Sequence, residues 1–235
     1  MISNTLRHGY GTDMPIWAWC YFPIALLVVQ FLAAELLEYE TYYKIIDTEL
    51  GLIENLTALF AVFAIITGCR IWFIRSNFPS VAYHVYIILL ISGCIYILGE
   101  EISWGQHYMQ WETPDWLGDI NQQNETNLHN VHNLFGVVPK VGLEWSIYIC
   151  GIFLALKFRK NNTVFDPKTN WQYWILPTFI IFPSALFAFI LRIIDRFENW
   201  FDWDYTVDWD ETHECLLIYV ILLYMLSIHK RLKQG

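Results

Sequence analysis

Charged residues are scarce in this sequence of 235 residues, and basic residues are fewer than acidic ones. The chain has 14 Lys and Arg against 23 Asp and Glu, so charged side chains make up 16% of it, where ordinary soluble domains have roughly 25%. A chain so poor in charge and so rich in apolar residues is neither disordered nor expected to fold as a water-soluble globule. The net charge of −9 argues against a nucleic acid as partner, because phosphates are bound by basic surfaces.

The sequence also lacks the marks of a disulfide framework, a redox centre or a phosphate loop. Its five cysteines lie within or at the edge of apolar segments and show no metal-type or redox spacing, as is typical of small packing residues. No internal repeat or low-complexity run divides the chain. Hydrophobic residues make up 56% of it instead, and they are gathered into blocks of about 20, the length that spans a bilayer.

Six apolar blocks predict six membrane-spanning helices. They do not alternate between apolar and polar residues as the strands of a membrane β-barrel do. The prediction is an all-α polytopic transmembrane helical bundle with short interfacial helices on the outer side, forming a single integral membrane domain over residues 1–235. The predicted spans are Pro15–Leu37, Gly51–Phe73, Val81–Ile102, Val141–Phe158, Trp171–Ile193 and His213–His229.

The distribution of charge predicts the orientation of these spans. With a cytoplasmic N-terminus, 10 of the 14 Lys and Arg residues fall on the cytoplasmic side, as the positive-inside rule requires. Only Asp13 and Asp166 join them there, so the other 21 of the 23 acids lie in outer loops or outer halves of spans. We therefore expect an integral protein of a bacterial inner (plasma) membrane with both termini in the cytoplasm.

Three segments are expected on the outer side. Glu38–Leu50 is predicted to form a helix lying in the membrane interface. The long loop Ser103–Lys140 begins with turn-forming residues and then predicts a short helix over about 124–135. Phe197–Glu211 is crowded with acidic and aromatic residues, and such a surface is suited to docking a protein partner.

The first candidate site is the adjacent carboxylate pair Glu100 and Glu101 at the outer end of the third span. Two neighbouring acids at the edge of hydrocarbon repel one another, which favours a shared proton or a bound cation, so both are candidate catalytic residues. The alternative is a pair of interfacial acids, one hydrated and the other paired with a helix N-terminus or with Arg192. Arg192, Gln106 and Trp104 are the candidate substrate-binding residues.

The second candidate site is a metal site. On a helix, Glu125, His129 and His132 stand at positions i, i+4 and i+7 and share one face. A carboxylate and two imidazoles suit a divalent metal, zinc above all, and His213 at the start of the last span is a further candidate ligand. The alternative is a surface helix whose histidines form hydrogen bonds to the loop.

Ionisable residues near the outer ends of all six spans favour one shared polar pocket. Each such group in a span costs on the order of 2–3 kcal/mol, so six independent placements are harder to explain than one common function. The further candidates from this set and its flanks are Glu214, Glu35, Glu54 and His107.

The string GEEISWGQ at residues 99–106, with NQQNETNLHN at residues 121–130, resembles a pattern of uncharacterised bacterial multi-pass membrane proteins. The resemblance covers about residues 99–133 and brings no known activity. It implies that these residues belong to one motif: Glu100, Glu101, Trp104, Gln106, Glu125, Asn127, His129 and Asn130.

A weaker similarity links the chain to the intramembrane glutamate endopeptidases of the CAAX-processing and bacteriocin-protection class. Glu100–Glu101 matches the acids of their Glu-Glu-x-x-x-Arg pattern, and His129-x-x-x-Asn133 matches their last motif. Gly105 stands in place of the arginine, however, and no Phe-x-x-x-His lies between the two matches. The similarity is therefore confined to mechanism, in which a glutamate activates water beside histidines.

Three classes of function follow from these patterns. The first is a membrane-embedded, metal-assisted hydrolase or transferase that acts on a lipid or lipid-linked substrate at the outer leaflet. The second is a non-enzymatic subunit or transporter that binds a cation or relays protons, and the third is a scaffold that docks a partner through its acidic, Trp-rich outer face. The inner halves of the spans carry almost no ionisable residues, which argues against an ion path and favours the enzyme.

Overall fold

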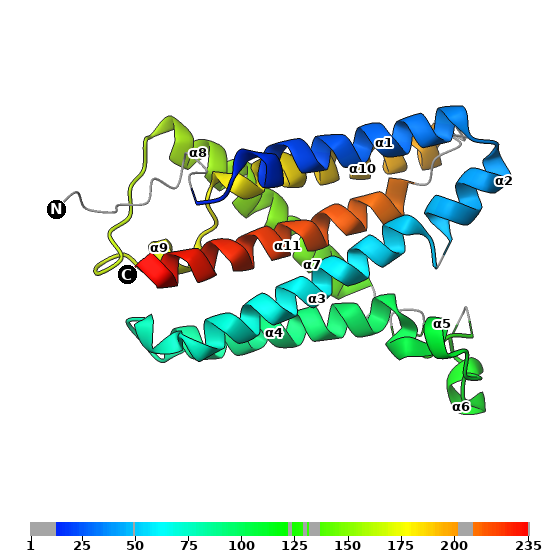
Figure 1. Cartoon of the computed structure of the whole chain (residues 1–235), viewed down its shortest axis with the longest axis horizontal. Helices are drawn as coiled ribbons and strands as arrows, with labels where there is room; N and C mark the ends of the chain where they lie inside the picture. The colour runs from blue at the N-terminus through cyan, green and yellow to red at the C-terminus, as the bar shows by residue number, and fades with distance from the viewer. Residues whose placement is uncertain are drawn as a thin grey trace.

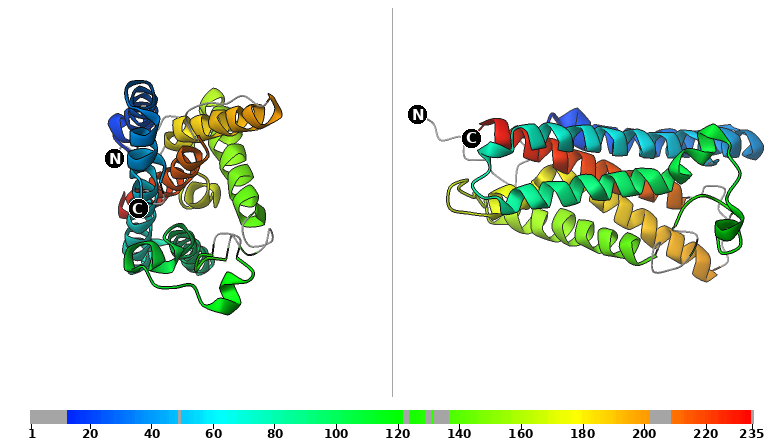
Figure 2. Two further views of the ribbon diagram at one scale, coloured as in Figure 1. Left: turned by 90° about the vertical axis from the view of Figure 1, so that its right-hand side faces the viewer. Right: turned by 90° about the horizontal axis from the view of Figure 1, so that it is seen from below.

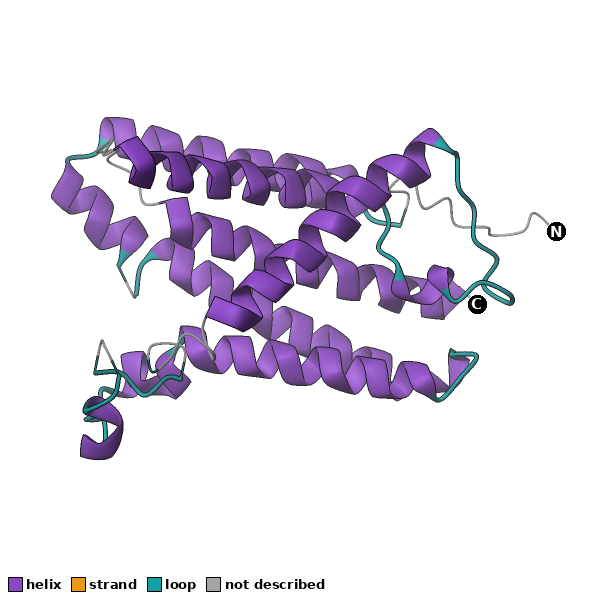
Figure 3. Ribbon diagram, turned by 180° about the vertical axis from the view of Figure 1, so that it is seen from behind, coloured by secondary structure: helices purple, strands orange, loops and turns teal. Residues whose placement is uncertain are grey.

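The computed structural model describes residues 13–48, 50–121, 124–128, 131, 137–201 and 209–234. Six of its helical segments are long and apolar enough to cross a membrane, and the described residues form no β-strand, which confirms the predicted all-α polytopic bundle (Figures 1 and 3). The segments are Trp17–Leu36, Leu52–Phe73, Ala82–Glu101, Val137–Lys160, Gln172–Phe197 and Trp209–Lys233.

Three of these segments are single helices and three contain a change of helical geometry. The single helices are α3 (Leu52–Phe73), α4 (Ala82–Glu101) and α11 (Trp209–Gln234). A π-helical turn, Trp17–Tyr21, precedes α1 (Phe22–Leu36), and another, Ile149–Leu154, joins α7 (Val137–Tyr148) to α8 (Ala155–Lys160). The fifth segment is made of α9 (Gln172–Ile175), a 3₁₀ turn (Phe179–Ile181) and α10 (Phe182–Phe201).

Helix α11 is the centre of the bundle. It packs against α3 on one side and α10 on the other, and α4 packs against α3 (Figure 2). In the most apolar 18-residue stretch of the span that contains α11, 72% is buried inside the bundle. The corresponding stretches of the spans that contain α1 and α4 are only 17% buried. The outer helices instead expose large apolar side chains such as Val28, Leu89 and Phe153. An apolar outer surface of this kind is stable in lipid and unstable in water.

The bundle has two chemically different ends. We call one the acidic end: it contains Glu54, Glu101, Glu144, Arg192 and Glu214, and the short helices α5 (Gln106–Met109) and α6 (Asp115–Gly118) lie there (Figure 1). We call the other the terminal end, where Asp13 meets the last turns of α11. An even number of spans requires both ends of the described chain to lie together.

The fifth span is interrupted at Leu176–Thr178. Pro177 supplies no N–H, and the residue before a proline is driven out of the helical region, as the extended ψ of 138° at Leu176 shows. Arg231, fully buried on α11, donates hydrogen bonds from Nη1 to the carbonyl of Tyr173 and to that of Leu176, the latter at 3.2 Å. A neighbouring helix thus satisfies the carbonyls that the proline frees, which is the condition for such a break in a membrane.

A second polar contact holds the start of the chain to the same break. The Asp13 carboxylate accepts hydrogen bonds from the hydroxyl of Thr178, at 2.7 Å, and from that of Ser227 on α11. Asp13, Thr178 and Ser227 are all buried. The terminal end therefore contains buried polar groups that the charge pattern alone did not predict.

The acidic end follows the predictions in part. Glu38–Leu50 contains α2 (Tyr39–Tyr42) and a π-helical turn (Tyr43–Asp47), as expected for a helical segment. The helix expected over 124–135 is wrong for residues 124–128, which form irregular loop, and residues 129, 130 and 132–136 lie outside the described residues. In Phe197–Glu211, α10 extends to Phe201 and α11 begins at Trp209, with 202–208 outside the described residues.

Side chains explain why residues 124–128 are not helical. Asn124 has a positive φ of 56°, which a right-handed helix does not allow. The amide of Thr126 donates to the Gln106 side chain at 2.6 Å, and that of Leu128 to Glu100 at 2.8 Å. Because side-chain acceptors occupy these amides, they cannot bond to carbonyls four residues earlier.

Candidate functional site

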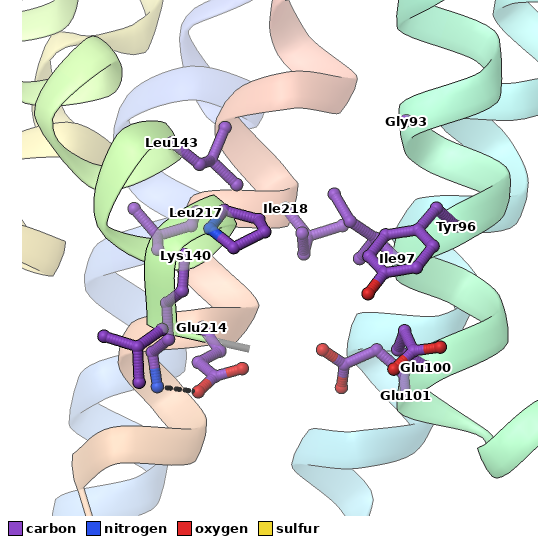
Figure 4. Close-up of a pocket in the computed structure, with 12 residues that line it drawn as sticks. Gly93, Tyr96, Ile97, Glu100, Glu101, Lys140, Leu143, Glu214, Leu217 and Ile218 are labelled. Atoms are coloured by element: carbon purple, nitrogen blue, oxygen red, sulfur yellow. Dashed lines mark hydrogen bonds and ion pairs between the residues drawn. The ribbon is translucent and has the colours of Figure 1, made fainter. Parts of the chain in front are cut away.

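A cavity of about 450 Å³ lies at the acidic end, between α4, α7 and α11. Glu101 points from the last turn of α4 across this space toward Glu214 on α11 (Figure 4). Its walls are otherwise mostly apolar. The lining residues are Gly93, Tyr96, Ile97, Glu100, Glu101, Val137, Pro139, Lys140, Leu143, Glu214, Leu217 and Ile218.

Lys140 is the cation of this cavity. It lies in the first turn of α7 and forms ion pairs with Glu214 and with Asp210, the latter at 3.2 Å (Figure 4). Its side chain is 29% exposed, so the ammonium is only partly shielded from its surroundings. A Lys–Glu pair therefore faces Glu101 from the opposite wall.

Two further carboxyls surround Glu101. Glu54, in the first turn of α3, and Glu211, in the first turn of α11, both interact electrostatically with it. Glu214 acts on Glu101 in the same way. Four acids thus approach one another beside a single ammonium, and the cavity has an acidic character.

Glu100 has a different role from its neighbour. One of its carboxylate oxygens accepts a hydrogen bond from the Trp104 indole at 2.9 Å, and the other accepts one from the Leu128 amide at 2.8 Å. Glu100 is buried and holds two parts of the 103–128 loop together. Of the adjacent pair, Glu101 is the carboxyl that lies among the acids of α3 and α11, where it forms a hydrogen bond with Glu54.

The loop is closed by a network around Glu125. Its carboxylate accepts hydrogen bonds from Ser103, at 2.9 Å, and from Asn127, and it lies 3.2 Å from Nε2 of His107. The Gln106 amide nitrogen donates to Thr113 at 2.8 Å. Apart from Glu101, the described residues of the motif thus belong to one hydrogen-bonded loop.

Two positions in the segment GEEISWGQ require glycine for steric reasons. A Cβ on Gly99 would lie 2.8 Å from the Trp104 ring, so only glycine lets the indole pack against α4 and reach Glu100. Gly105 has a φ of 104°, a conformation that favours glycine, and it follows Ser103 and Trp104, which are also at positive φ. The tight turn after α4 thus depends on the GEEISWG sequence.

His213 belongs to a separate cluster. It is 1% exposed, and its Nε2 lies 2.9 Å from the Tyr148 hydroxyl and 3.8 Å from Glu144. Its Nδ1 lies 3.7 Å from Asp210. This places His213 among groups from α7 and α11, where its contacts do not include Glu125.

Arg192 is held in the same cluster by three carboxylates. It pairs with Glu144 and Asp195 at 3.2 Å each and with Asp210 at 2.9 Å. Asp195 thus contacts Arg192, whereas the hydrogen bonds of Glu100 described above are with Trp104 and Leu128. Asp210 connects this cluster to Lys140 and so to the cavity.

The predicted site residues therefore separate into groups. Glu101 and Glu214 line the cavity, and Glu54 lies beside Glu101. Glu100, Trp104, Gln106, His107 and Glu125 build the loop beside it, and His213 and Arg192 form the neighbouring cluster. Glu35 stays exposed at the end of α1, and His129 and His132 lie outside the described residues.

Sequence reasoning missed Lys140, Tyr148 and Asp210 as site residues. In the sequence, Lys140 is one of the four Lys and Arg residues that fall on the expected outer side. The signal was its position four residues before Glu144, which puts both on one face of a helix. Tyr148 meets His213 only through the docking of α7 against α11, whereas Asp210 precedes His213 by three residues on α11.

No protein-family model, curated protein or solved structure matches this chain. The function must therefore be inferred from the geometry of the site.

Two of the four predicted metal ligands, Glu125 and His213, lie in different parts of the acidic end. Within the described residues, no group of three or more His, Cys, Asp or Glu side chains is placed to hold a metal ion. The predicted ligands His129 and His132 lie outside those residues, while Glu125 and His213 take part in two different hydrogen-bonded clusters. Zinc binding by these four residues stays a prediction.

Proposed function

We propose that this protein is a membrane-embedded hydrolase or transferase that acts on a lipid or lipid-linked substrate in the cavity between α4, α7 and α11. One observation carries the proposal. A carboxyl group, Glu101, faces a Lys140–Glu214 ion pair across a mostly apolar cavity in helices that span a membrane. Paired acid and cation in an apolar site are the elements of proton transfer to or from a bound molecule.

The groups of the cavity have distinct roles in this proposal. Glu101 acts as general base, taking a proton from water or from a substrate hydroxyl, and returns it to the leaving group as general acid. Lys140 stabilises negative charge that develops on the substrate, and Glu214 holds the ammonium in position. The loop fixed by Glu100 keeps Glu101 at the head of the cavity.

The proposal includes a divalent metal as a component to be tested. Such a metal would lower the pKa of a bound water or polarise the substrate, and its expected ligands are the loop histidines with Glu125 and His213. Elemental analysis of the purified protein and of a His129→Ala variant tests this part alone. Bound zinc that the variant loses would support it, and the absence of transition metal with full activity in the variant would remove it.

The transport alternative is supported by one observation, the buried Asp13 and Arg231 beside the interrupted fifth span. Ion or proton transport needs polar groups through the depth of the membrane. Between the acidic end and the break, the walls of the cavities are apolar apart from Ser146, cysteines and tyrosines. This lining suits a hydrocarbon chain better than an ion, so we favour the lipid enzyme.

A comparison of the lipids in cells that produce Glu101→Gln with those that produce the natural sequence tests the proposed function. Loss of a general acid–base group lowers turnover by about 10²–10⁴-fold, so the substrate should accumulate and the product should disappear. The matched control is Glu35→Gln, which changes an exposed acid at the end of α1. Identical lipid profiles in the Glu101→Gln and natural proteins, at equal amounts in the membrane, would overturn the proposal.

A further inference from the structure

A second cavity continues the first toward the terminal end. It has a volume of about 290 Å³ and lies between α4, α7, the interrupted fifth span and α11. Gly93, Ile97 and Leu143 line both cavities, so the two form one groove along α4. We call it the α4 groove.

The α4 groove has a charged head and an apolar stem. Glu101, Glu214 and Lys140 form the head. The stem is lined by residues such as Leu90, Ile147 and Val220, and it ends at Ile175–Pro177 beside Tyr86. The Tyr86 hydroxyl lies 2.6 Å from that of Tyr224, which in turn donates to the Ile175 carbonyl at 2.5 Å. These hydroxyls are bonded to protein, so the stem offers little to bind water.

The length of the groove fits an extended chain. Glu101 and Tyr86 lie 15 residues apart on α4, and a rise of 1.5 Å per residue gives about 22 Å between head and end. This exceeds half of the roughly 30 Å hydrocarbon core. A single hydrocarbon chain entering from the head would therefore pass the middle of the bilayer.

Gly93 keeps the groove open. It lies midway along α4 and is exposed, and a Cβ added there would meet no atom within 4 Å. A larger residue at this position would project into the space where the two cavities join. The surroundings of an exposed groove in a membrane-spanning helix are lipid tails, which supply an apolar occupant directly.

The charges of the head select among lipids. Glu101 is surrounded by Glu54, Glu211 and Glu214, and Lys140 is the cation on the facing wall. An ammonium is attracted by the carboxylates and a phosphate by Lys140, whereas a purely anionic head group meets like charges. A zwitterionic, amine-bearing head fits both signs.

We propose that the α4 groove binds one hydrocarbon chain of an amine-bearing, zwitterionic membrane phospholipid, with its ammonium among the carboxylates of the head. This names the substrate class for the proposed enzyme and rests on that function for its biological meaning. The binding itself is a separate claim and is tested without any measurement of turnover.

The probe is phosphatidylethanolamine with a photoactivatable group near the end of one acyl chain, in vesicles with the purified full-length protein. Irradiation should label peptides of α4, α7 or α9, which line the stem. The same probe with a phosphatidylglycerol head should label at least fivefold less. Equal labelling by both head groups, or labelling confined to peptides outside the groove, would overturn the proposal.

The decisive variant is Gly93→Leu, with Gly142→Leu as its matched control. A Cβ at Gly142 also meets nothing within 4 Å, and Gly142 is exposed on α7 but lines neither cavity. Gly93→Leu should reduce labelling at least tenfold while Gly142→Leu leaves it unchanged. Leu143→Trp narrows the same junction from the opposite wall and should reduce labelling as well, which guards against misfolding of one variant.

The outcomes separate this inference from the proposed function. Labelling that Gly93→Leu abolishes, in a protein whose lipid profile does not respond to Glu101→Gln, would support the groove and reject the enzyme. Turnover that requires Glu101, with labelling insensitive to both groove variants in correctly folded protein, would support the enzyme and reject the groove. Unfolding temperatures of the variants in detergent establish that they are folded.

Discussion

Replacement of Arg192 by Gln should destabilise the protein chiefly through one of its three partners. Arg192 pairs with Glu144, Asp195 and Asp210, whose side chains are 7%, 24% and 36% exposed. An exposed ion pair contributes about 0–1 kcal/mol. Removal of the cation from a buried pair costs about 3–5 kcal/mol, because it leaves a desolvated charge without compensation.

The expected loss for Arg192→Gln is therefore about 3–5 kcal/mol, nearly all of it from Glu144. A second substitution, Glu144→Gln, should restore much of the lost free energy of unfolding. Glu144→Gln alone leaves Arg192 with two partners, and the double variant Arg192→Gln, Glu144→Gln has no orphaned buried charge, so it should be more stable than Arg192→Gln by about 2 kcal/mol.

Reversible unfolding of the purified protein in mixed micelles measures these free energies. Arg196→Gln is the control, since Arg196 is an exposed arginine one turn further along the same helix, and its replacement should change stability by less than about 0.5 kcal/mol. Two results would refute the reasoning. One is a loss for Arg192→Gln as small as that of the control, and the other is strict additivity of the two substitutions in the double variant.

Three further predictions follow from other contacts. Gly99→Ala should cost about 1–3 kcal/mol and make the loop after α4 sensitive to protease, because its Cβ would lie 2.8 Å from the Trp104 ring, whereas Gly93→Ala should be neutral. Arg231→Gln should cost at least about 2 kcal/mol in unfolding free energy by leaving buried carbonyls unsatisfied, with Lys233→Gln on the exposed side of α11 unaffected. Reporter fusions in the loop between α6 and α7 and after α11 should lie on opposite sides of the membrane, the latter in the cytoplasm, and the reverse orientation would contradict the positive-inside assignment.

The fold was predictable because hydrophobic length alone specifies membrane spans. The second span was predicted as Gly51–Phe73 and forms as Leu52–Phe73. The fourth span was predicted to begin at Val141 and begins at Val137, so that Pro139 lies within its first turn. Proline is tolerated in the first turn of a helix, where its missing N–H has no partner to lose.

The site was predictable as a location but not as an arrangement. Acids near the ends of the spans predicted a shared pocket, and in the structure Glu54, Glu101 and Glu214 lie near one another. Adjacent residues of a helix point about 100° apart, so sequence could not tell which of Glu100 and Glu101 faces the cavity. The helix predicted over 124–135 was wrong for another reason. The amides of this segment form hydrogen bonds with side chains distant in sequence, and such bonds leave no periodic pattern in the sequence.

The anchoring of Glu100 couples the loop to the direction of its neighbour. Because Glu100 is bound by Trp104 and by the amide of Leu128, the last turn of α4 cannot rotate without breaking both contacts. The loop therefore works as a rotational stop, and it sets the angle at which Glu101 faces α11. The two consecutive glutamates therefore have different roles. A change in the loop that removed the contacts of Glu100 would also change the direction in which Glu101 points.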